Sequence, residues 1–407
     1  MVVSILRRDV FSVTDSVLKY YFYKSTKAVE FYRPIMYLFF LAQGLNFTQI
    51  AILEAIYNLT TVLGEIPTGY VGDRVGRRNS LLIGTTLITL TLVGIGLAGS
   101  FLVFAILYVF WSMGYNFRSG SEDAWLYDTL TDDLSEEEFA HVRGRGESVA
   151  LGVGAGAAIL GGYLGSIDLS LPWFVAASVT GIGVAVLLTM DEPDTYEEVD
   201  SSTLSLGRTV DIVKDAISRP NIRALILYYY VLYAAVTYLV FVFLQPIFET
   251  VVVDLGVTPG QVESLIGWFY AAYSLVGAVL SYYTGWIRQH IGIRTWFLVL
   301  PFIVGGALTG MYFVPILALP TFLLARGLAD VTRSFAAQYV NDRIETLGRA
   351  TVLSAMAMVS GLTVIPFQLG SGVISDLMSP LYALAIAGVV LVVGSGAILL
   401  WEVPIAE

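Results

Sequence analysis

Twelve apolar stretches, separated by short polar connections, dominate this chain of 407 residues. A helix needs about 20 mostly apolar residues to cross a bilayer, and in lipid its backbone groups must bond to each other. With 56% hydrophobic and 14% charged residues, the composition is far from that of soluble globular proteins. We therefore predict an all-α polytopic membrane protein. The expected membrane-spanning helices cover residues 16–43, 48–70, 79–99, 101–130, 143–166, 172–190, 221–249, 260–284, 294–313, 316–342, 349–375 and 380–401.

An acidic segment interrupts this pattern between the sixth and seventh stretches. Six acids and Pro193 lie between Asp191 and Asp200, and apolar residues at helical spacing follow before Pro220. Such spacing predicts a short amphipathic helix on the membrane surface. We expect three parts: a six-helix bundle over 1–190, an acidic cytoplasmic linker over 191–220, and a second six-helix bundle over 221–407.

The segment from Gly69 to Arg78 reads G-Y-V-G-D-R-V-G-R-R and separates the second and third predicted helices. Glycines permit a sharp chain reversal, and cations favour the cytoplasmic side. This pattern resembles the signature loop of the major facilitator superfamily (MFS). The matching residues are Gly69, Gly72, Asp73, Arg74, Gly76, Arg77 and Arg78. The resemblance implies the MFS fold, with twelve helices in two pseudo-symmetric six-helix bundles, and a gating loop in which Asp73 makes and breaks ion pairs.

A weaker copy of this loop occurs in the second half. Gly285, Gln289 and Gly292 follow Gly69, Asp73 and Gly76 at a constant offset of 216 residues. An internal repeat of this kind is what the MFS resemblance implies, with the substrate site near the membrane midplane between the halves. The alternative is a chance similarity of two glycine-rich loops.

The positions of Lys and Arg predict the orientation. Apart from six cations inside predicted helices, the cations lie in connections or helix ends on one side, and the connections on the other side contain none. Cytoplasmic loops carry the excess of Lys and Arg. We expect a multi-pass protein of the cell membrane, acting as a monomer, with both termini in the cytoplasm.

The cations inside predicted helices are expected to face a wet cavity or an acidic partner, because each costs roughly 2.5–3.5 kcal/mol at a helix centre facing lipid. Lys24, Lys27, Glu30 and Arg33 follow one another at steps of three along the first helix. Glu30 is therefore within reach of both Lys27 and Arg33. The alternative for the lysines is that they extend to the cytoplasmic interface.

Arginine–acid pairs also occur on the fourth and tenth predicted helices. Arg118 and Glu122 are four residues apart, as are Arg326 and Asp330, and Arg333 extends the second stripe. The two pairs are 208 residues apart, close to the offset of the loop repeat. A fourth-helix Arg takes part in proton coupling in many MFS members, and Arg118 resembles it, although the spacing to the next glycine differs. Functional pairs and structural ion pairs are both open interpretations.

Asp123 and Asp128 lie closer to the cytoplasm than Glu122. We expect them to pair with Arg143, Arg145 or the signature loop as a latch of the cytoplasmic gate.

Aromatic residues are dense on the seventh and eighth predicted helices. Tyr233, Tyr238 and Tyr273 fall near mid-span, where they are expected either to line an amphipathic pocket or to pack between helices. The fifth helix carries six glycines between Gly152 and Gly165, which favour close helix contact. They also resemble the antiporter motif of drug exporters, although the Pro that ends that motif is absent.

Several function classes are disfavoured by composition. The chain has no cysteine, its two histidines fall in predicted loops, and it has no nucleotide-binding G-x-x-x-x-G-K-S/T run. We therefore expect no metal site, no cofactor and no enzyme activity. A net charge of −11 argues against nucleic-acid binding, and four Lys against 18 Arg resembles proteins of salt-loving archaea. A GC-rich genome with one acidic loop explains the same balance.

These features predict a secondary active transporter of a small solute that works by alternating access, coupled to protons, with export as one possible direction. Glu122, Asp330 and Glu30 are the expected coupling acids. The alternatives are an uncoupled uniporter, a membrane sensor without flux, and a lipid-handling protein. Four cations in the predicted cavity favour an anionic or zwitterionic solute, whereas the aromatic residues also suit a hydrophobic one.

Overall fold

The computed structural model describes residues 15–131, 136–192, 220–343 and 349–404. We call residues 15–192 the N-terminal half and residues 220–404 the C-terminal half. The predicted amphipathic helix of the linker lies outside the described residues. The helices of the N-terminal half are α2 (Asp15–Ala28), α3 (Met36–Ala42), α4 (Phe47–Val75), α5 (Arg77–Leu97), α6 (Phe101–Arg118), α7 (Ser121–Thr131), α8 (Glu136–Ile167) and α9 (Leu171–Leu188).

The C-terminal half repeats this pattern of long helices. Its elements are α11 (Pro220–Leu225), the π-helix η2 (Ile226–Tyr233), α12 (Ala234–Asp254), α13 (Pro259–Tyr282), α14 (Thr284–His290), α15 (Ile293–Phe313), the short 3-10 turn η3 (Pro315–Leu317), α16 (Ala318–Asn341), α17 (Arg349–Leu377) and α18 (Pro380–Trp401). Each of the twelve predicted stretches contains helix at the expected place, although the first and the fourth are interrupted. Within the described residues, ten helical segments are long and apolar enough to cross a membrane, and α4, bent by 52° at Pro67, brings the number to eleven.

The first predicted helix is not continuous, which corrects the expectation for residues 16–43. Helix α2 ends at Ala28, the chain passes through turns, and α3 begins at Met36. Pro34 explains the interruption, because proline lacks an N–H group and disfavours helical geometry in the residue before it. The break places the polar residues Glu30 and Arg33 on non-helical backbone inside the protein.

The fourth predicted helix is also divided. Helix α6 ends at Arg118 and α7 begins at Ser121, with Gly120 between them at φ +77°. Positive φ favours glycine because it lacks a Cβ atom. The helical register therefore changes between Arg118 and Glu122, and these two residues do not share one continuous helix face.

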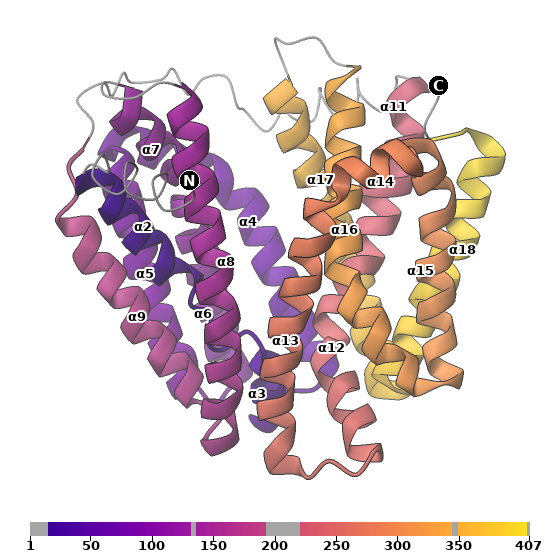
Figure 1. Ribbon diagram of the computed structural model, residues 1–407. Coiled ribbons are helices and arrows are strands. Elements are labelled where there is room, and N and C mark those ends of the chain that lie inside the picture. Colours follow the sequence, from indigo (N-terminus) through magenta and orange to yellow (C-terminus); the bar gives the residue numbers. More distant parts are fainter. Residues whose placement is uncertain (1–14, 132–135, 193–219, 344–348, 405–407) are drawn as a thin grey trace, which may run out of the picture.

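The two halves stand side by side and meet along two helix pairs, α8 with α13 and α4 with α17 (Figure 1). We call the end where α9 finishes and α11 begins the linker end. Both helix pairs approach most closely near the opposite end. A Cβ atom on Gly162 of α8 would lie 2.4 Å from the Glu263 carbonyl oxygen of α13, and one on Gly372 of α17 would lie 2.9 Å from the Phe47 carbonyl oxygen of α4. Small residues thus let the halves close at that end.

The repeat predicted from sequence is visible in the backbone. Gly76 joins α4 to α5 at φ +93° and ψ 161°, and Gly292 precedes α15 at φ +78° and ψ 150°. The expected loop from Gly69 to Arg78 is shorter than predicted, because α4 continues to Val75 and the reversal occurs at Gly76.

Candidate functional site

A cavity with charged residues in its lining lies between the halves and consists of two neighbouring chambers. Chamber 1, of about 540 Å³, is lined by both halves, and chamber 2, of about 530 Å³, lies mainly within the N-terminal half. Glu30, Arg33, Tyr238 and Phe241 line both chambers. A cavity of this size suits a small-molecule ligand.

The cavity opens toward the linker end. The lining of chamber 1 includes Glu147, Tyr229 and Arg333, which lie toward that end of α8, η2 and α16. At the opposite end, the Asp376 carboxylate of α17 accepts hydrogen bonds from the backbone N–H groups of Phe47 (2.8 Å) and Thr48 (2.9 Å) at the start of α4. The Thr48 hydroxyl donates a third, at 2.5 Å. This bridge joins the halves where the cavity is closed.

A second bridge holds the interruption between α2 and α3. The Gln245 amide of α12 is fully buried, donates to the Arg33 carbonyl at 2.7 Å and accepts from the Tyr37 N–H at 2.7 Å. It also donates to the Tyr270 hydroxyl at 3.0 Å. Buried backbone groups freed by a helix break require such partners. Sequence analysis did not predict this bridge, and the available signal was an amide inside an apolar stretch.

Charged side chains of chamber 1 form the ion pairs predicted for the tenth span. The Arg326 Nε atom lies 3.8 Å from the Asp330 carboxylate, which also bonds Arg333. The Arg326 guanidinium lies 5.7 Å from the centre of the Tyr273 ring. Tyr233 and Tyr238 line the same chamber, so the three tyrosines predicted for a pocket are placed in it.

Glu30 and Arg33 lie where the two chambers meet. Their side chains form an ion pair with 3.3 Å between the Arg33 Nε atom and the Glu30 carboxylate. Arg33 also lies 4.7 Å from the centre of the Phe241 ring in the other half. The predicted contact of Glu30 with Arg33 is confirmed, whereas Lys27, the other neighbour expected to reach Glu30, bonds Glu122 instead.

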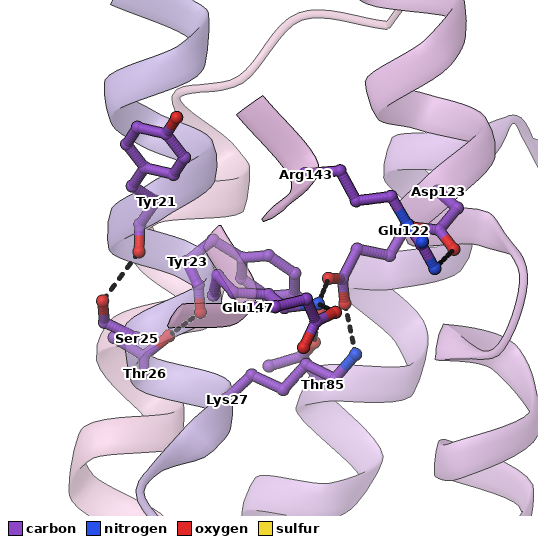
Figure 2. A network of polar contacts seen from close by, with 11 residues as sticks. Tyr21, Tyr23, Ser25, Thr26, Lys27, Thr85, Glu122, Asp123, Arg143 and Glu147 are labelled. Carbon is purple, nitrogen blue, oxygen red and sulfur yellow. Dashed lines mark hydrogen bonds and ion pairs between the residues drawn. The ribbon is translucent and has the colours of Figure 1, made fainter. Parts of the chain in front are cut away.

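Glu122 has different partners from those expected. Its carboxylate bonds Lys27 of α2 (Figure 2 shows Glu122 and Lys27) and also bonds Lys24 of the same helix at 2.5 Å. Lys24 in turn reaches Glu147 of α8 at 2.8 Å. The expected pair with Arg118 is not formed among the described residues, because the break at Gly120 turns Glu122 toward α2. Lys27 and Arg118 line chamber 2, whereas Glu122 is not among the residues that line it. The lysines are thus paired inside the protein instead of extending to the interface.

Glu54 of α4 is a site residue that sequence analysis missed. Its side chain is buried, with 4% of the residue exposed. The carboxylate accepts hydrogen bonds from Tyr238 at 2.6 Å and Tyr37 at 3.1 Å, with Tyr108 at the limiting distance of 3.5 Å. These tyrosines come from α12, α3 and α6. An acid in the middle of an apolar stretch was the available signal.

The residues predicted to form the gate lie at the linker end of the N-terminal half. Asp73 bonds Arg77 at 2.9 Å, and Arg77 lies 3.8 Å from Asp128, so the predicted contact between Asp128 and the signature segment is confirmed. Arg74 stacks on the Tyr70 ring at 4.3 Å. A side chain at Gly76 would meet the Glu192 carboxylate at 2.6 Å.

Four further residues predicted for the gate, and the pair of Asp123 with Arg143, belong to the same region. Arg78 donates to the carbonyls of Leu187 and Leu188 at 2.9 Å, which ties α5 to the end of α9. Asp123 forms two hydrogen bonds of 2.9 Å with Arg143, as predicted for a latch, while Arg145 lies two residues further along α8 (Figure 2 shows Asp123 and Arg143). Gly69 lies within α4, and a Cβ on Gly72 would lie 2.9 Å from the Ser80 hydroxyl.

The fold and cavity are those of a polytopic transporter, and the comparisons agree. The chain belongs to the Major Facilitator Superfamily, whose sequence model matches residues 28–358. No match was found among curated proteins.

Solved structures share the fold at low sequence identity. A mutant form of the nucleoside transporter NupG is 12% identical, with a TM-score of 0.81 over 94% of this chain and 98% of that one. A bacterial homologue of the iron transporter ferroportin in the inward-facing state is 15% identical, with a TM-score of 0.69 over 95% and 97%. A bacterial homologue of the human lysosomal transporter Spinster, inward-facing and unoccupied, is 16% identical, with a TM-score of 0.70 over 94% and 95%. These likenesses show the fold alone.

Proposed function

We propose that this protein is a secondary active transporter that moves a small solute across the cell membrane by alternating access, coupled to protons. One observation carries the proposal: a charged cavity between two halves is open at the linker end and closed at the other by bonds between the halves. Breaking those bonds and closing the linker end would present the same cavity to the other side. The halves are the parts that we expect to rock, with boundaries near residues 190 and 221.

Glu54 is the acid that we assign to proton coupling. Its three partners are hydroxyl groups, each of which can donate or accept a hydrogen bond, so they can satisfy the carboxyl group with or without a proton. One partner, Tyr238, belongs to the other half. Movement of the halves would break that bond and change the environment of the proton. Glu30, Glu122 and Asp330 contact cations instead, which favours a permanent charge.

The groups that face Glu54 come from four elements and the break after α2. The hydroxyls of Tyr37, Tyr108 and Tyr238 bond it, and Tyr57 and Arg33 act on it through their charges or dipoles. Among these groups Arg33 is the cation, and it is paired with Glu30.

Transport by purified protein in proteoliposomes tests the proposal. A thermal-shift screen of metabolites across pH supplies a ligand, and its accumulation is measured with and without an imposed pH gradient. We expect Glu54→Gln to abolish gradient-driven accumulation and to spare exchange of the ligand, because exchange moves no net proton. Asp330→Asn is the comparison variant, expected to retain coupling.

Each other outcome has a defined meaning. Accumulation by Glu54→Gln at the native level would overturn the assignment of Glu54. A native protein that equilibrates the ligand regardless of the pH gradient would be a uniporter, and one that binds the ligand without flux would be a sensor.

The proposed orientation places both termini and the linker in the cytoplasm. The chain lacks cysteine, so a single introduced cysteine is the one thiol in the protein that a reagent can label. On intact cells, an impermeant thiol reagent should label Asp254→Cys, at the end of α12, and should not label Ser201→Cys in the linker. The reverse pattern would invert the topology.

A further inference from the structure

Arg118 is a buried cation without a counter-ion in the described part of the chain. It closes the last turn of α6, is 8% exposed, and lines chamber 2. Its Nε atom is buried and has no hydrogen-bond partner among the described residues. The stem is held by close packing, since a Cβ on Gly84 of α5 would lie 2.9 Å from the Arg118 Cγ atom.

The other cations of chamber 2 are already neutralised. Lys27 bonds Glu122, and Arg33 pairs with Glu30. The remaining acid of the chamber, Glu54, is surrounded by tyrosine hydroxyls. The negative end of the α6 dipole offsets about half a charge at Arg118. A buried arginine inside a membrane span normally has a full partner, so the chamber favours an anion that the protein itself does not supply.

The walls next to Arg118 are aromatic. Trp111, Tyr115 and Arg118 are spaced at four and three residues and therefore share one face of α6. Tyr57 of α4 packs edge-on against Trp111, with 6.0 Å between the ring centres, and all of these side chains line the chamber. Aromatic faces and edges of this kind accept a further ring in edge-on or offset packing.

We propose that chamber 2 binds an organic anion that carries an aromatic ring, with its anionic group on the Arg118 guanidinium and its ring among Trp111, Tyr57 and Tyr115. A carboxylate or a phosphate would provide this chemistry, because both match the planar fork of guanidinium donors. The inference rests on the proposed function for the statement that the bound anion is also transported.

Binding to the purified full-length protein in detergent tests the site without requiring flux. The probes are benzoate and phenyl phosphate, with benzyl alcohol as the neutral compound of similar shape. Calorimetric titration up to about 5 mM covers ligands with a Kd near 1 mM. We expect at least one of the two anions to bind, and benzyl alcohol to bind about tenfold more weakly or not at all.

Three variants locate the anion. Arg118→Gln should weaken binding of the anion by about tenfold to a hundredfold, the range for a lost charge-assisted hydrogen bond. Arg118→Lys retains the positive charge but not the planar guanidinium group. Its affinity for the anion should lie between that of Arg118→Gln and that of the native protein. Arg326→Gln, in chamber 1, is the matched control and should change the affinity by less than about threefold. The thermal midpoint without ligand shows whether each variant is folded.

The outcomes separate the site from the proposed function. Failure of both anions to bind, equal binding of benzyl alcohol, or a loss in Arg326→Gln that exceeds the loss in Arg118→Gln would overturn the anion site. If Arg118→Gln does not fold, the test uses Arg118→Lys instead. Native anion affinity in Arg118→Lys, together with weaker anion binding in Arg326→Gln, would then overturn the anion site. Anion binding that depends on Arg118 in a protein without flux would support the site and overturn transport.

Discussion

The bridge between Asp376 and the start of α4 provides a direct test of how the cavity is held open at the linker end. Asp376 belongs to α17, and it accepts two backbone N–H groups and one hydroxyl from α4. Asp376→Asn keeps the size of the side chain, removes its charge and replaces one acceptor oxygen by a donor. Because these hydrogen bonds join different halves, the substitution should destabilise the state in which the halves are closed at the end opposite the linker end.

The magnitude follows from the number and type of bonds. Hydrogen bonds to a charged group contribute about 1.5–3 kcal/mol each when shielded, and a charge at a helix N-terminus about 0.3–1 kcal/mol. Asp376 is exposed and the Asn oxygen retains part of the contact, so we expect a net loss of about 1–2 kcal/mol. That loss changes the ratio of the two states by about 5- to 30-fold. A linker-closed state populated at about 1% would rise to about 5–23%.

Distances between spin labels measure this ratio. Labels on Gly144→Cys of α8 and Gln289→Cys of α14 lie at exposed positions at the linker end of the two halves. Asp376→Asn should increase the population with a short distance. Asp168→Asn is the matched control, because Asp168 is an exposed acid at the same end as Asp376 whose bonds go to Ser170 within its own half. Identical distance distributions in both variants and the native protein would refute the reasoning.

Three further predictions concern the backbone that frames the cavity, each measured as a thermal midpoint in detergent. Gly76→Ala forces a side chain into φ +93° and should destabilise the protein by about 1–2 kcal/mol; an unchanged midpoint would contradict the strain. Gly161→Ala places a Cβ atom 1.9 Å from the Phe31 carbonyl oxygen and should lower the thermal midpoint. Gly156→Ala is the control, because its Cβ atom would have no neighbour within 4 Å, and it should leave the midpoint unchanged. Equal midpoints in the two variants would argue against close packing at Gly161. Gln245→Leu leaves the Arg33 carbonyl and the Tyr37 N–H unpaired, and each unpaired buried group should lower the free energy of unfolding by about 1–3 kcal/mol. A midpoint at the native value would show that water replaces the amide.

Features that depend on neighbouring residues were predictable from the sequence. Helix positions followed from the lengths of the apolar stretches, because a bilayer sets the same length requirement on every span. The reversal at Gly76 and its counterpart at Gly292 followed from glycine spacing. The pair of Arg326 with Asp330, four residues apart on one continuous helix, also formed as predicted.

Breaks inside spans were only partly predictable. Pro34 marks the first break, but proline occurs inside α4, α12, α15 and α17 without ending them. The interruption between α2 and α3 persists because Gln245, more than two hundred residues away, satisfies its backbone groups. The break at Gly120 redirected Glu122 to lysines of α2, which made the expected pair with Arg118 wrong.

The sequence by itself determined the class of protein, the approximate places of its helices and the side on which its cations gather, because each of these depends on local hydrophobicity and charge. The tertiary structure decided which charges are matched and which are left for a ligand. Glu54 is held by tyrosines from three other helices, and Arg118 is left without a partner among the described residues by the turn of the chain after α6. Which side chains from distant helices become partners depends on how the helices pack. Residue spacing along the chain carries no information about that packing.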